Sequence, residues 1–231
     1  MIARMPPAAP LAALGAFAAL LALVVGGWAP LHAADSALSG DFRGYGSRHP
    51  DVVSVVRIAT DVAATLPFLF AGAAATALFT TRRDRVRAMF CGAVTVAAPV
   101  LWTLMHWLIY RPRPQDGFVA LDTNGFPSGH TTNAAAAGLA AVLLVWPAAS
   151  RRVRAGMVAA AALFALAIGL SRIALLAHWP SDVLGGWLLA LGVVPLLAYA
   201  VTPRRRARPT PPGPGSPPAP GCAGRAWPGS G

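Results

Sequence analysis

Six apolar blocks, each about as long as a membrane-crossing helix, dominate this 231-residue sequence. A hydrocarbon core of about 30 Å is crossed by roughly 20 helical residues. Only 12% of the residues are charged and 56% are hydrophobic, so we predict an all-α protein, an integral membrane bundle of six transmembrane helices. The blocks are Leu11–Leu31, Ile58–Phe79, Ala88–Tyr110, Thr131–Ala148, Ala155–Leu176 and Val183–Val201.

The placement of arginine predicts how the bundle lies in the membrane. Arg4 precedes the first block, and arginine clusters follow the second, fourth and sixth blocks. Cytoplasmic connections carry an excess of basic residues, so we predict a multi-pass protein of the cell (inner) membrane with both termini in the cytoplasm. The net charge of +11 then reflects topology, and we expect no nucleic acid partner. The clusters are Arg82, Arg83, Arg85 and Arg87; Arg151, Arg152 and Arg154; and Arg204, Arg205, Arg206 and Arg208.

The blocks divide the chain into four parts. Residues 1–32 form the first transmembrane helix, although Arg4, the apolar run and the small residues of "LHAADSA" also resemble a secretory signal with a cleavage site. The run is long for a signal, which favours a retained membrane anchor, and cleavage stays an open alternative. Residues 33–57 are expected to be an extracytoplasmic loop that covers the site or contacts a headgroup. Residues 58–202 form the core, and 203–231 a disordered cytoplasmic tail rich in Pro, Gly and Arg.

Ionisable side chains gather at the ends of the blocks that this topology places outside. Burying such groups near lipid is costly, so they are candidates for function. Three histidines, three arginines and one aspartate could bind an anionic group and move protons beside it. Alternative interpretations are an aromatic belt around His106, rim charges at Arg111 and Arg113, and a structural pair of His178 and Asp182. The full set is His106, Arg111, Arg113, His130, Arg172, His178 and Asp182.

The spacing of these residues is more specific than their number. "HWLIYRPRP" places His106 seven residues before Arg113-Pro114, "PSGH" ends at His130, and "SRIALLAHWPSD" runs from Ser171-Arg172 through His178 to Asp182. Over residues 58–202 the sequence resembles the type 2 phosphatidate phosphatase superfamily, whose membrane members are lipid phosphatases related to vanadium haloperoxidases. The signature of that family is Lys, six residues, Arg-Pro; then Pro-Ser-Gly-His; then Ser-Arg, five residues, His, three residues, Asp. This sequence departs from it at His106, which stands in place of the lysine.

The resemblance implies a role for each matched position. His178 would be the nucleophile that forms a phosphohistidine, with Asp182 hydrogen-bonded to its other ring nitrogen. His130 would protonate the leaving oxygen and then activate water. The expected phosphate-binding residues are Arg113, Arg172, His106, Ser128, Gly129, Ser171 and Arg111, of which His106 would be a weaker ligand than lysine and Arg111 could supply the missing charge.

The residue types fit this chemistry on physical grounds. Arginine forks bind phosphate oxygens in pairs, and "PSGH" opens a helix whose free N–H groups face the same anion. No cluster of carboxylates or cysteines offers a metal site, and Cys91 and Cys222 form no disulfide framework. We therefore expect metal-independent chemistry with no cofactor.

The sequence thus predicts a membrane phosphatase that hydrolyses the terminal phosphate of a lipid phosphate or diphosphate at the extracytoplasmic face. Two alternatives stay open: a lipid phosphotransferase that uses the same site, and a non-enzymatic lipid-phosphate binder or transporter. The lipid headgroup, the chain and the oligomeric state are not specified by the sequence.

Overall fold

The computed structural model describes residues 2–121 and 123–202, and these are folded into eight α-helices and two single-turn 3₁₀ segments, without β-strands. The predicted disordered tail, 203–231, lies outside the described residues. The elements are α1 (Ala8–Val25), α2 (Ala29–Arg48), α3 (Pro50–Thr60), η1 (Asp61–Ala63), α4 (Thr65–Thr81), α5 (Arg85–Leu108), α6 (Gly129–Val145), η2 (Trp146–Ala148), α7 (Arg151–Ala174) and α8 (Pro180–Val201).

Six helical segments of the described chain are long and apolar enough to cross a membrane, which confirms the predicted all-α bundle. The second span begins at Pro50 rather than Ile58 and bends where the α-helix gives way to η1. A proline in the first turn of a helix lacks only an N–H that would be unpaired there, so Pro50 starts this helix at no cost. The spans are Ala8–Val25, Pro50–Thr81, Arg85–Leu108, Gly129–Ala148, Arg151–Ala174 and Pro180–Val201.

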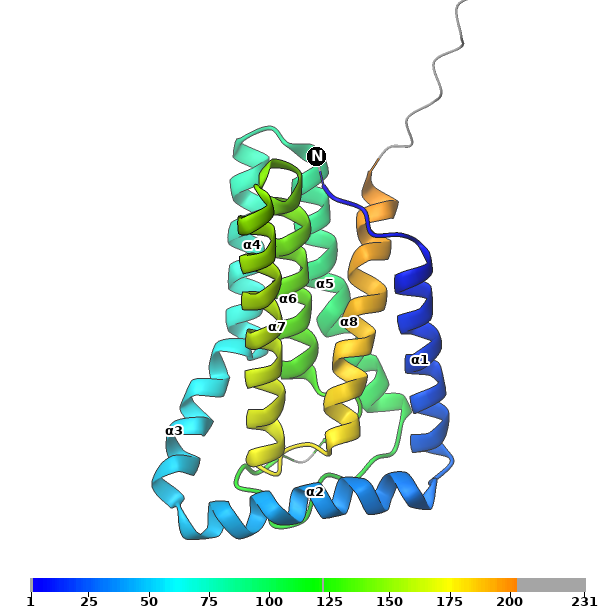
Figure 1. Ribbon diagram of the computed structural model, residues 1–231, viewed down its shortest axis with the longest axis vertical. Coiled ribbons are helices and arrows are strands. Elements are labelled where there is room, and N and C mark those ends of the chain that lie inside the picture. Colours follow the sequence, from blue (N-terminus) through cyan, green and yellow to red (C-terminus); the bar gives the residue numbers. More distant parts are fainter. Residues whose placement is uncertain (1, 122, 203–231) are drawn as a thin grey trace, which may run out of the picture.

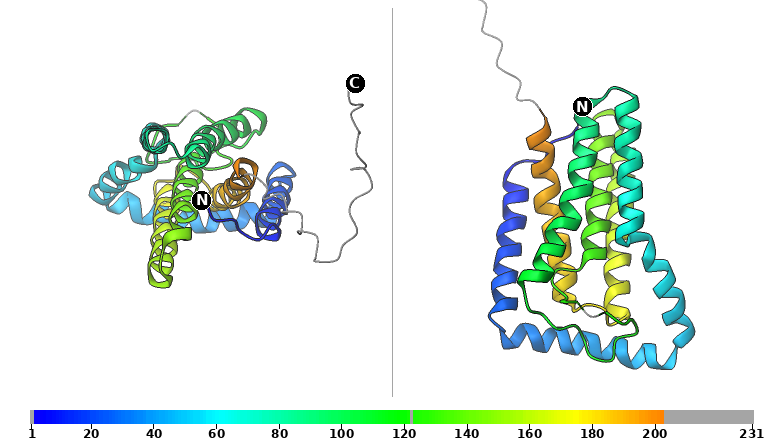
Figure 2. Two further views of the ribbon diagram at one scale, coloured as in Figure 1. Left: turned by 90° about the horizontal axis from the view of Figure 1, so that it is seen from above. Right: turned by 180° about the vertical axis from the view of Figure 1, so that it is seen from behind.

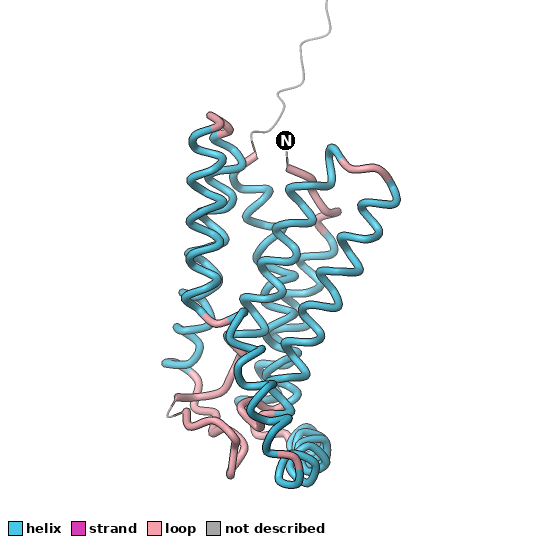
Figure 3. Tube along the Cα trace, turned by 90° about the vertical axis from the view of Figure 1, so that its left-hand side faces the viewer, coloured by secondary structure: helices cyan, strands magenta, loops and turns pink. Residues whose placement is uncertain are grey.

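The predicted loop over residues 33–57 is helical, which corrects that expectation. Most of it is α2, which lies across one end of the bundle in Figure 1 and is seen nearly end-on in Figure 3. Pro30 in its first turn and its alanines favour a helix. The segment is too polar to cross the membrane, so it packs against the ends of α7 and α8 instead.

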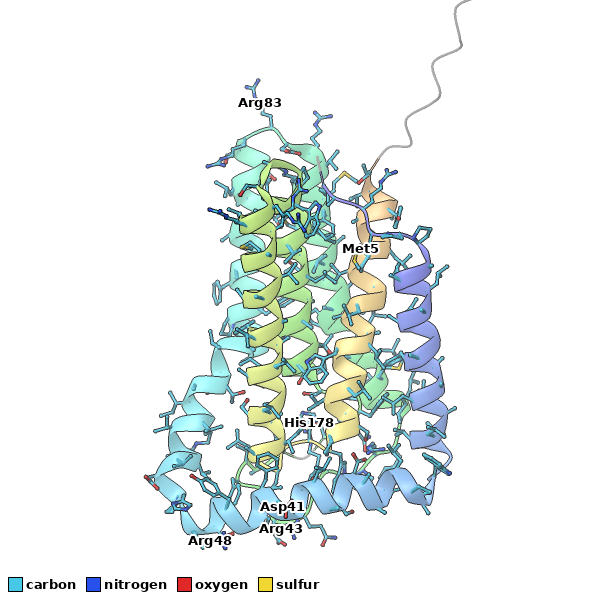
Figure 4. The ribbon with its side chains drawn as sticks, viewed as in Figure 1. Met5, Asp41, Arg43, Arg48, Arg83 and His178 are labelled. Atoms are coloured by element: carbon cyan, nitrogen blue, oxygen red, sulfur yellow. The ribbon has the colours of Figure 1, made fainter. Side chains whose placement is uncertain are left out.

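The two ends of the bundle differ in what they carry. The N-terminus, the end of α8 and the connections after α4 and α6 lie together at one end, where Arg83 is seen in Figure 4. The other end holds α2, the long connection 109–128 and the short connection 175–179 (Figure 1 and Figure 2). His178 lies near this second end in Figure 4, opposite Arg83. The connections that carry the arginine clusters therefore lie at the opposite end of the bundle from α2.

Helix α6 is central to the bundle because it contacts α4, α5, α7 and α8. A side chain at Gly138 would come within 3.0 Å of the Ala161 Cβ, so glycine allows α6 and α7 to approach closely. Glycine likewise brings the Ser128 carbonyl against α8, because a Cβ at Gly186 would come within 2.9 Å of that oxygen. This contact places the start of α6 beside the start of α8.

Helix α1 is packed into the bundle against α8. The Phe17 ring stacks on Phe126 with ring centroids 5.7 Å apart, and Leu14 occupies the space that a side chain at Gly192 would need. Phe17, Leu20 and Val24 are buried in the same apolar cluster as Phe126 and Leu189. Removing α1 would expose this cluster.

Candidate active site

A cavity of about 700 Å³ opens at the end of the bundle opposite the arginine-rich connections. It brings together side chains from the ends of α5, α6 and α7 and from the connections that follow α5 and α7. Six residues predicted for the site line it: His106, Arg113, Gly129, His130, Arg172 and His178. The wall also contains aromatic and apolar side chains, among them Trp102, Trp107, Tyr110 and Leu121.

His178 is presented from the turn between α7 and α8, and one hydrogen bond defines its tautomer. Its Nδ1 lies 2.8 Å from the carbonyl oxygen of Gly125. A carbonyl can only accept, so Nδ1 carries the proton and Nε2 is unprotonated. Nε2 lies 3.0 Å from Nη1 of Arg113, which also lines the cavity. The unprotonated nitrogen therefore faces the position that a phosphate bound to Arg113 would occupy.

Burial keeps this imidazole neutral. Removal from water lowers the pKa of His178 well below its ordinary value, and the positive charges of Arg113 and Arg172 lower it further. The ring is therefore uncharged at neutral pH, which is the form in which Nε2 can act as a nucleophile.

The predicted hydrogen bond between Asp182 and His178 is wrong in this structure. Asp182 is the third residue of α8, and its Oδ2 accepts the backbone N–H of Trp179 at 2.9 Å, which caps the helix. The same oxygen lies 3.6 Å from His178 Nδ1, too far for a hydrogen bond, and the Gly125 carbonyl takes that position. The carboxylate is fully buried beside the ring.

The two cavity arginines are held in different ways. Arg113 donates from Nε to the Thr123 carbonyl at 2.7 Å and from Nη1 to the Ala177 carbonyl at 2.6 Å, so its fork is fixed between the two connections. Burial lowers the pKa of Arg113, but the guanidinium stays charged because its ordinary pKa is far above neutrality. Arg172 is 4% exposed, and its Nε has no hydrogen-bond partner among the described residues. A buried guanidinium with an unused donor is suited to bind an anion.

In the "PSGH" turn, Ser128 is structural, whereas Gly129 and His130 line the cavity. Ser128 is fully buried, its N–H donates to the Asp182 carbonyl at 2.9 Å, and its Oγ accepts from Thr131. Ser128 therefore holds the turn against α8 and does not line the cavity. Gly129 and His130, the first two residues of α6, do line it. A Cβ at Gly129 would come within 3.0 Å of the Trp102 ring, so the close approach requires glycine.

Comparison with known proteins agrees with this geometry. Residues 109–206 match the PAP2 superfamily. Over this segment the chain is similar to the PAP2 superfamily. Its structure matches the crystal structure of a transmembrane PAP2 type phosphatidylglycerolphosphate phosphatase from Bacillus subtilis with a TM-score of 0.67 and 27% sequence identity, over 83% of this chain and 93% of that one. No curated protein sequence matches the chain significantly.

The departure from the PAP2 signature, His106, has a defined environment. Its Nε2 lies 2.8 Å from the Pro127 carbonyl, and its ring packs on Trp102 with centroids 5.2 Å apart. Because the carbonyl accepts, Nε2 carries a proton and a neutral ring offers only a lone pair at Nδ1. His106 therefore holds the turn before His130, and a hydrogen bond from Nδ1 to phosphate would require the protonated ring.

Besides Ser128, two further residues predicted to bind phosphate do not reach the cavity. Arg111 lies outside it, with Nη2 2.6 Å from Asp35 Oδ2 in a buried ion pair, so it does not replace the missing lysine charge. Ser171 Oγ is 2.8 Å from Thr60 Oγ1 and 2.6 Å from the Ile168 carbonyl, so it joins α7 to α3. Both are structural neighbours of the site.

Sequence reasoning missed the segment that precedes "PSGH". Asn124 donates to the His106 carbonyl at 2.9 Å and accepts from the Arg111 N–H at 3.1 Å, and the Gly125 carbonyl orients His178. The only signal was the turn composition of "DTNG", which indicates a loop and not a function. Within residues 2–121 and 123–202, no three His, Cys, Asp or Glu side chains are grouped so that they could hold a metal ion.

Proposed function

We propose that this protein hydrolyses the terminal phosphate of a lipid phosphate or diphosphate at the extracytoplasmic face of the membrane, through a phosphohistidine. The observation that carries the proposal is the unprotonated Nε2 of His178, which faces a cavity that also contains Arg113 and Arg172. A neutral nucleophile beside two guanidinium groups suits transfer of a phosphoryl group, because catalysis of that reaction depends on positioning and on charge neutralisation.

In the first step Nε2 of His178 attacks phosphorus, and the bond between phosphorus and the leaving oxygen breaks. The negative charge of the bound phosphate favours the protonated ring of His130, which lines the same cavity, and this imidazolium gives its proton to that oxygen. The phosphorylated ring keeps its Nδ1 proton and becomes an imidazolium, which the Gly125 carbonyl and the Asp182 carboxylate stabilise. Arg113 exchanges its contact with Nε2 for the phosphate oxygens, and Arg172 binds the same group.

In the second step water attacks the phosphorus, and the bond to Nε2 breaks. His130 now accepts a proton from the water, which returns both histidines to their starting forms and releases inorganic phosphate. The residues that the mechanism uses directly are His178, His130, Arg113, Arg172 and the Gly129 N–H.

The rim of the cavity supports a lipid as substrate. Trp107 and Tyr110 line the cavity, yet they are 84% and 85% exposed. Exposed aromatic side chains at the end of an apolar helix are typical of the membrane interface, where lipid headgroups lie. The phosphatidylglycerolphosphate phosphatase activity named for the Bacillus subtilis enzyme makes a glycerophospholipid phosphate one substrate to test, beside polyprenyl diphosphates and phosphorylated envelope glycolipids.

Arginine placement supports the proposed side of the membrane. Arg83 lies at one end of the bundle and His178 toward the other in Figure 4, and the basic end is expected in the cytoplasm. A site at the extracytoplasmic face would act on lipids that have already crossed the membrane.

Phosphate release from a panel of lipid phosphates by purified protein tests the proposed function. Vanadate, which adopts the five-coordinate geometry of phosphoryl transfer, is expected to inhibit, and a metal chelator is expected to leave the rate unchanged. Inhibition by the chelator without inhibition by vanadate would contradict the proposed chemistry. Transfer of labelled phosphate to a second lipid would indicate a phosphotransferase, and binding without release would indicate a binder or transporter.

The buried state of His178 predicts an unusual pH profile. The pKa of His178 lies well below its ordinary value, so the nucleophile loses its lone pair only when the pH falls through that lowered pKa. The ¹⁵N chemical shifts of the His178 ring in detergent-solubilised protein are expected to stay those of a neutral imidazole between pH 7.5 and 5.5. A histidine with an ordinary pKa would change from about nine-tenths to about one-tenth neutral over the same range, and that result would contradict a buried neutral nucleophile.

The variant His106→Lys tests the departure from the PAP2 signature. Lysine can donate to the Pro127 carbonyl as His106 does and adds a permanent charge, so we expect activity equal to wild type or higher. His106→Ala removes the donor and is expected to lose about tenfold or more in kcat/KM. Equal losses in the two variants would show that the imidazole does something that lysine cannot.

A further inference from the structure

A buried polar cluster joins α2 to the beginning of α8. Asp35 of α2 accepts the Ser181 N–H at 2.9 Å, the Ser181 hydroxyl at 2.6 Å and Nη2 of Arg111 at 2.6 Å. Arg111 in turn places its Nε 2.8 Å from Asp182 Oδ1, a contact in which neither atom makes a well-aligned hydrogen bond. The side chains of Asp35, Arg111 and Asp182 are 3%, 3% and 0% exposed, so water screens none of these charges.

The charges of this cluster do not cancel. Two carboxylates and one guanidinium leave one negative charge, and the Asp182 carboxylate is the member that approaches His178, at 3.6 Å. If Asp35 were absent, the positive charge of Arg111 would neutralise the charge of Asp182. Asp35 binds the same guanidinium more directly, with a hydrogen bond of 2.6 Å, and so its charge offsets that of Arg111.

We infer that Asp35 is a positioning residue for His178: it neutralises Arg111 and leaves the charge of Asp182 to stabilise the imidazolium that forms when His178 is phosphorylated. The inference rests on the proposed function. It makes α2 a working part of the site, although α2 contributes no side chain to the cavity around His178. It also gives Arg111 a role other than phosphate binding.

The variant Asp35→Asn tests this inference because it removes the charge and keeps the size of the side chain. The cluster then becomes neutral, so kcat for a lipid phosphate is expected to fall about tenfold to a hundredfold. KM is expected to change by less than about threefold, because Arg113 and Arg172 are untouched. Asp41→Asn, the same substitution at an exposed position of α2, is the matched control and is expected to keep the wild-type rate.

The double variant Asp35→Asn with Arg111→Gln separates charge from structure. It restores one net negative charge, so kcat is expected to recover to within about threefold of wild type. If Asp35 merely anchored α2, the second substitution would weaken the cluster further, and a folded double variant as slow as Asp35→Asn would overturn the inference. If Asp35→Asn does not fold, the kcat of the double variant, compared with wild type, still tests the inference.

The outcomes also separate this inference from the proposed function. An active wild type together with a fully active Asp35→Asn overturns the inference alone. A wild type that releases no phosphate from any lipid phosphate removes the proposed function and the inference together. Unfolding midpoints measured in detergent for each variant show that rates are compared between folded proteins.

Discussion

Replacing His178 by alanine is expected to lower phosphate release from a lipid phosphate by about four orders of magnitude or more, because the variant has no nucleophile to take the phosphoryl group. The ring makes one hydrogen bond to the Gly125 carbonyl and one contact with Arg113, so its loss leaves the helices in place. The measurement is kcat under saturating lipid, beside the unfolding midpoint of the same sample.

His49→Ala is the matched control for this loss. His49 packs on Tyr45 between α2 and α3, with ring centroids 4.3 Å apart, and it does not line the cavity. We expect the control to keep the wild-type rate. A folded His178→Ala variant that retains more than about 1% of the wild-type rate would be incompatible with a phosphohistidine on this residue.

The second large effect is expected at His130 and depends on the leaving group. His130→Ala removes the proposed general acid, so kcat for a lipid phosphate is expected to fall by about 10² to 10⁴. Formation of the phosphohistidine from an aryl phosphate needs no such proton and should slow far less. Breakdown of the intermediate still needs the base, so phosphoenzyme is expected to accumulate.

Rapid mixing with the two substrates separates these steps. A fast burst of aryl alcohol followed by slow phosphate release in His130→Ala would fit the two roles of His130. Equal losses for lipid and aryl phosphates, with no burst, would show that His130 positions the phosphate and does not move protons.

Much of the site was predictable because its chemistry is local in sequence. Spacing alone places His178 in the turn before α8 and His130 in the first turn of α6, and the ends of apolar helices must meet at the same membrane face. The structure accordingly brings His130, Arg113, Arg172 and His178 to one cavity. The six spans follow from length and hydrophobicity, which the bilayer imposes directly.

The sequence could not predict hydrogen bonds that involve backbone groups or residues far apart in the chain. The partner of His178 Nδ1 is a backbone carbonyl, which any residue carries, so no side chain at Gly125 indicates it. The capping of α8 takes Asp182 away from the ring. Asp35 and Ser181 are separated by 146 positions, and a lone aspartate among alanines carries no signal of such a contact. Hydropathy likewise separates spans from polar segments, but it cannot tell a polar helix such as α2 from a loop.

Trapping the phosphorylated enzyme tests the central claim most directly. Wild-type protein is mixed with a lipid labelled in its terminal phosphate and quenched in alkali, which preserves phosphohistidine, before one turnover is complete. We predict one label per chain on His178, lost on exposure to acid and absent from His178→Ala. With a labelled aryl phosphate, whose leaving group needs no proton, the label is expected to increase in His130→Ala. Phosphate release by the wild type without any trapped label, or a label that persists in His178→Ala, would contradict the account.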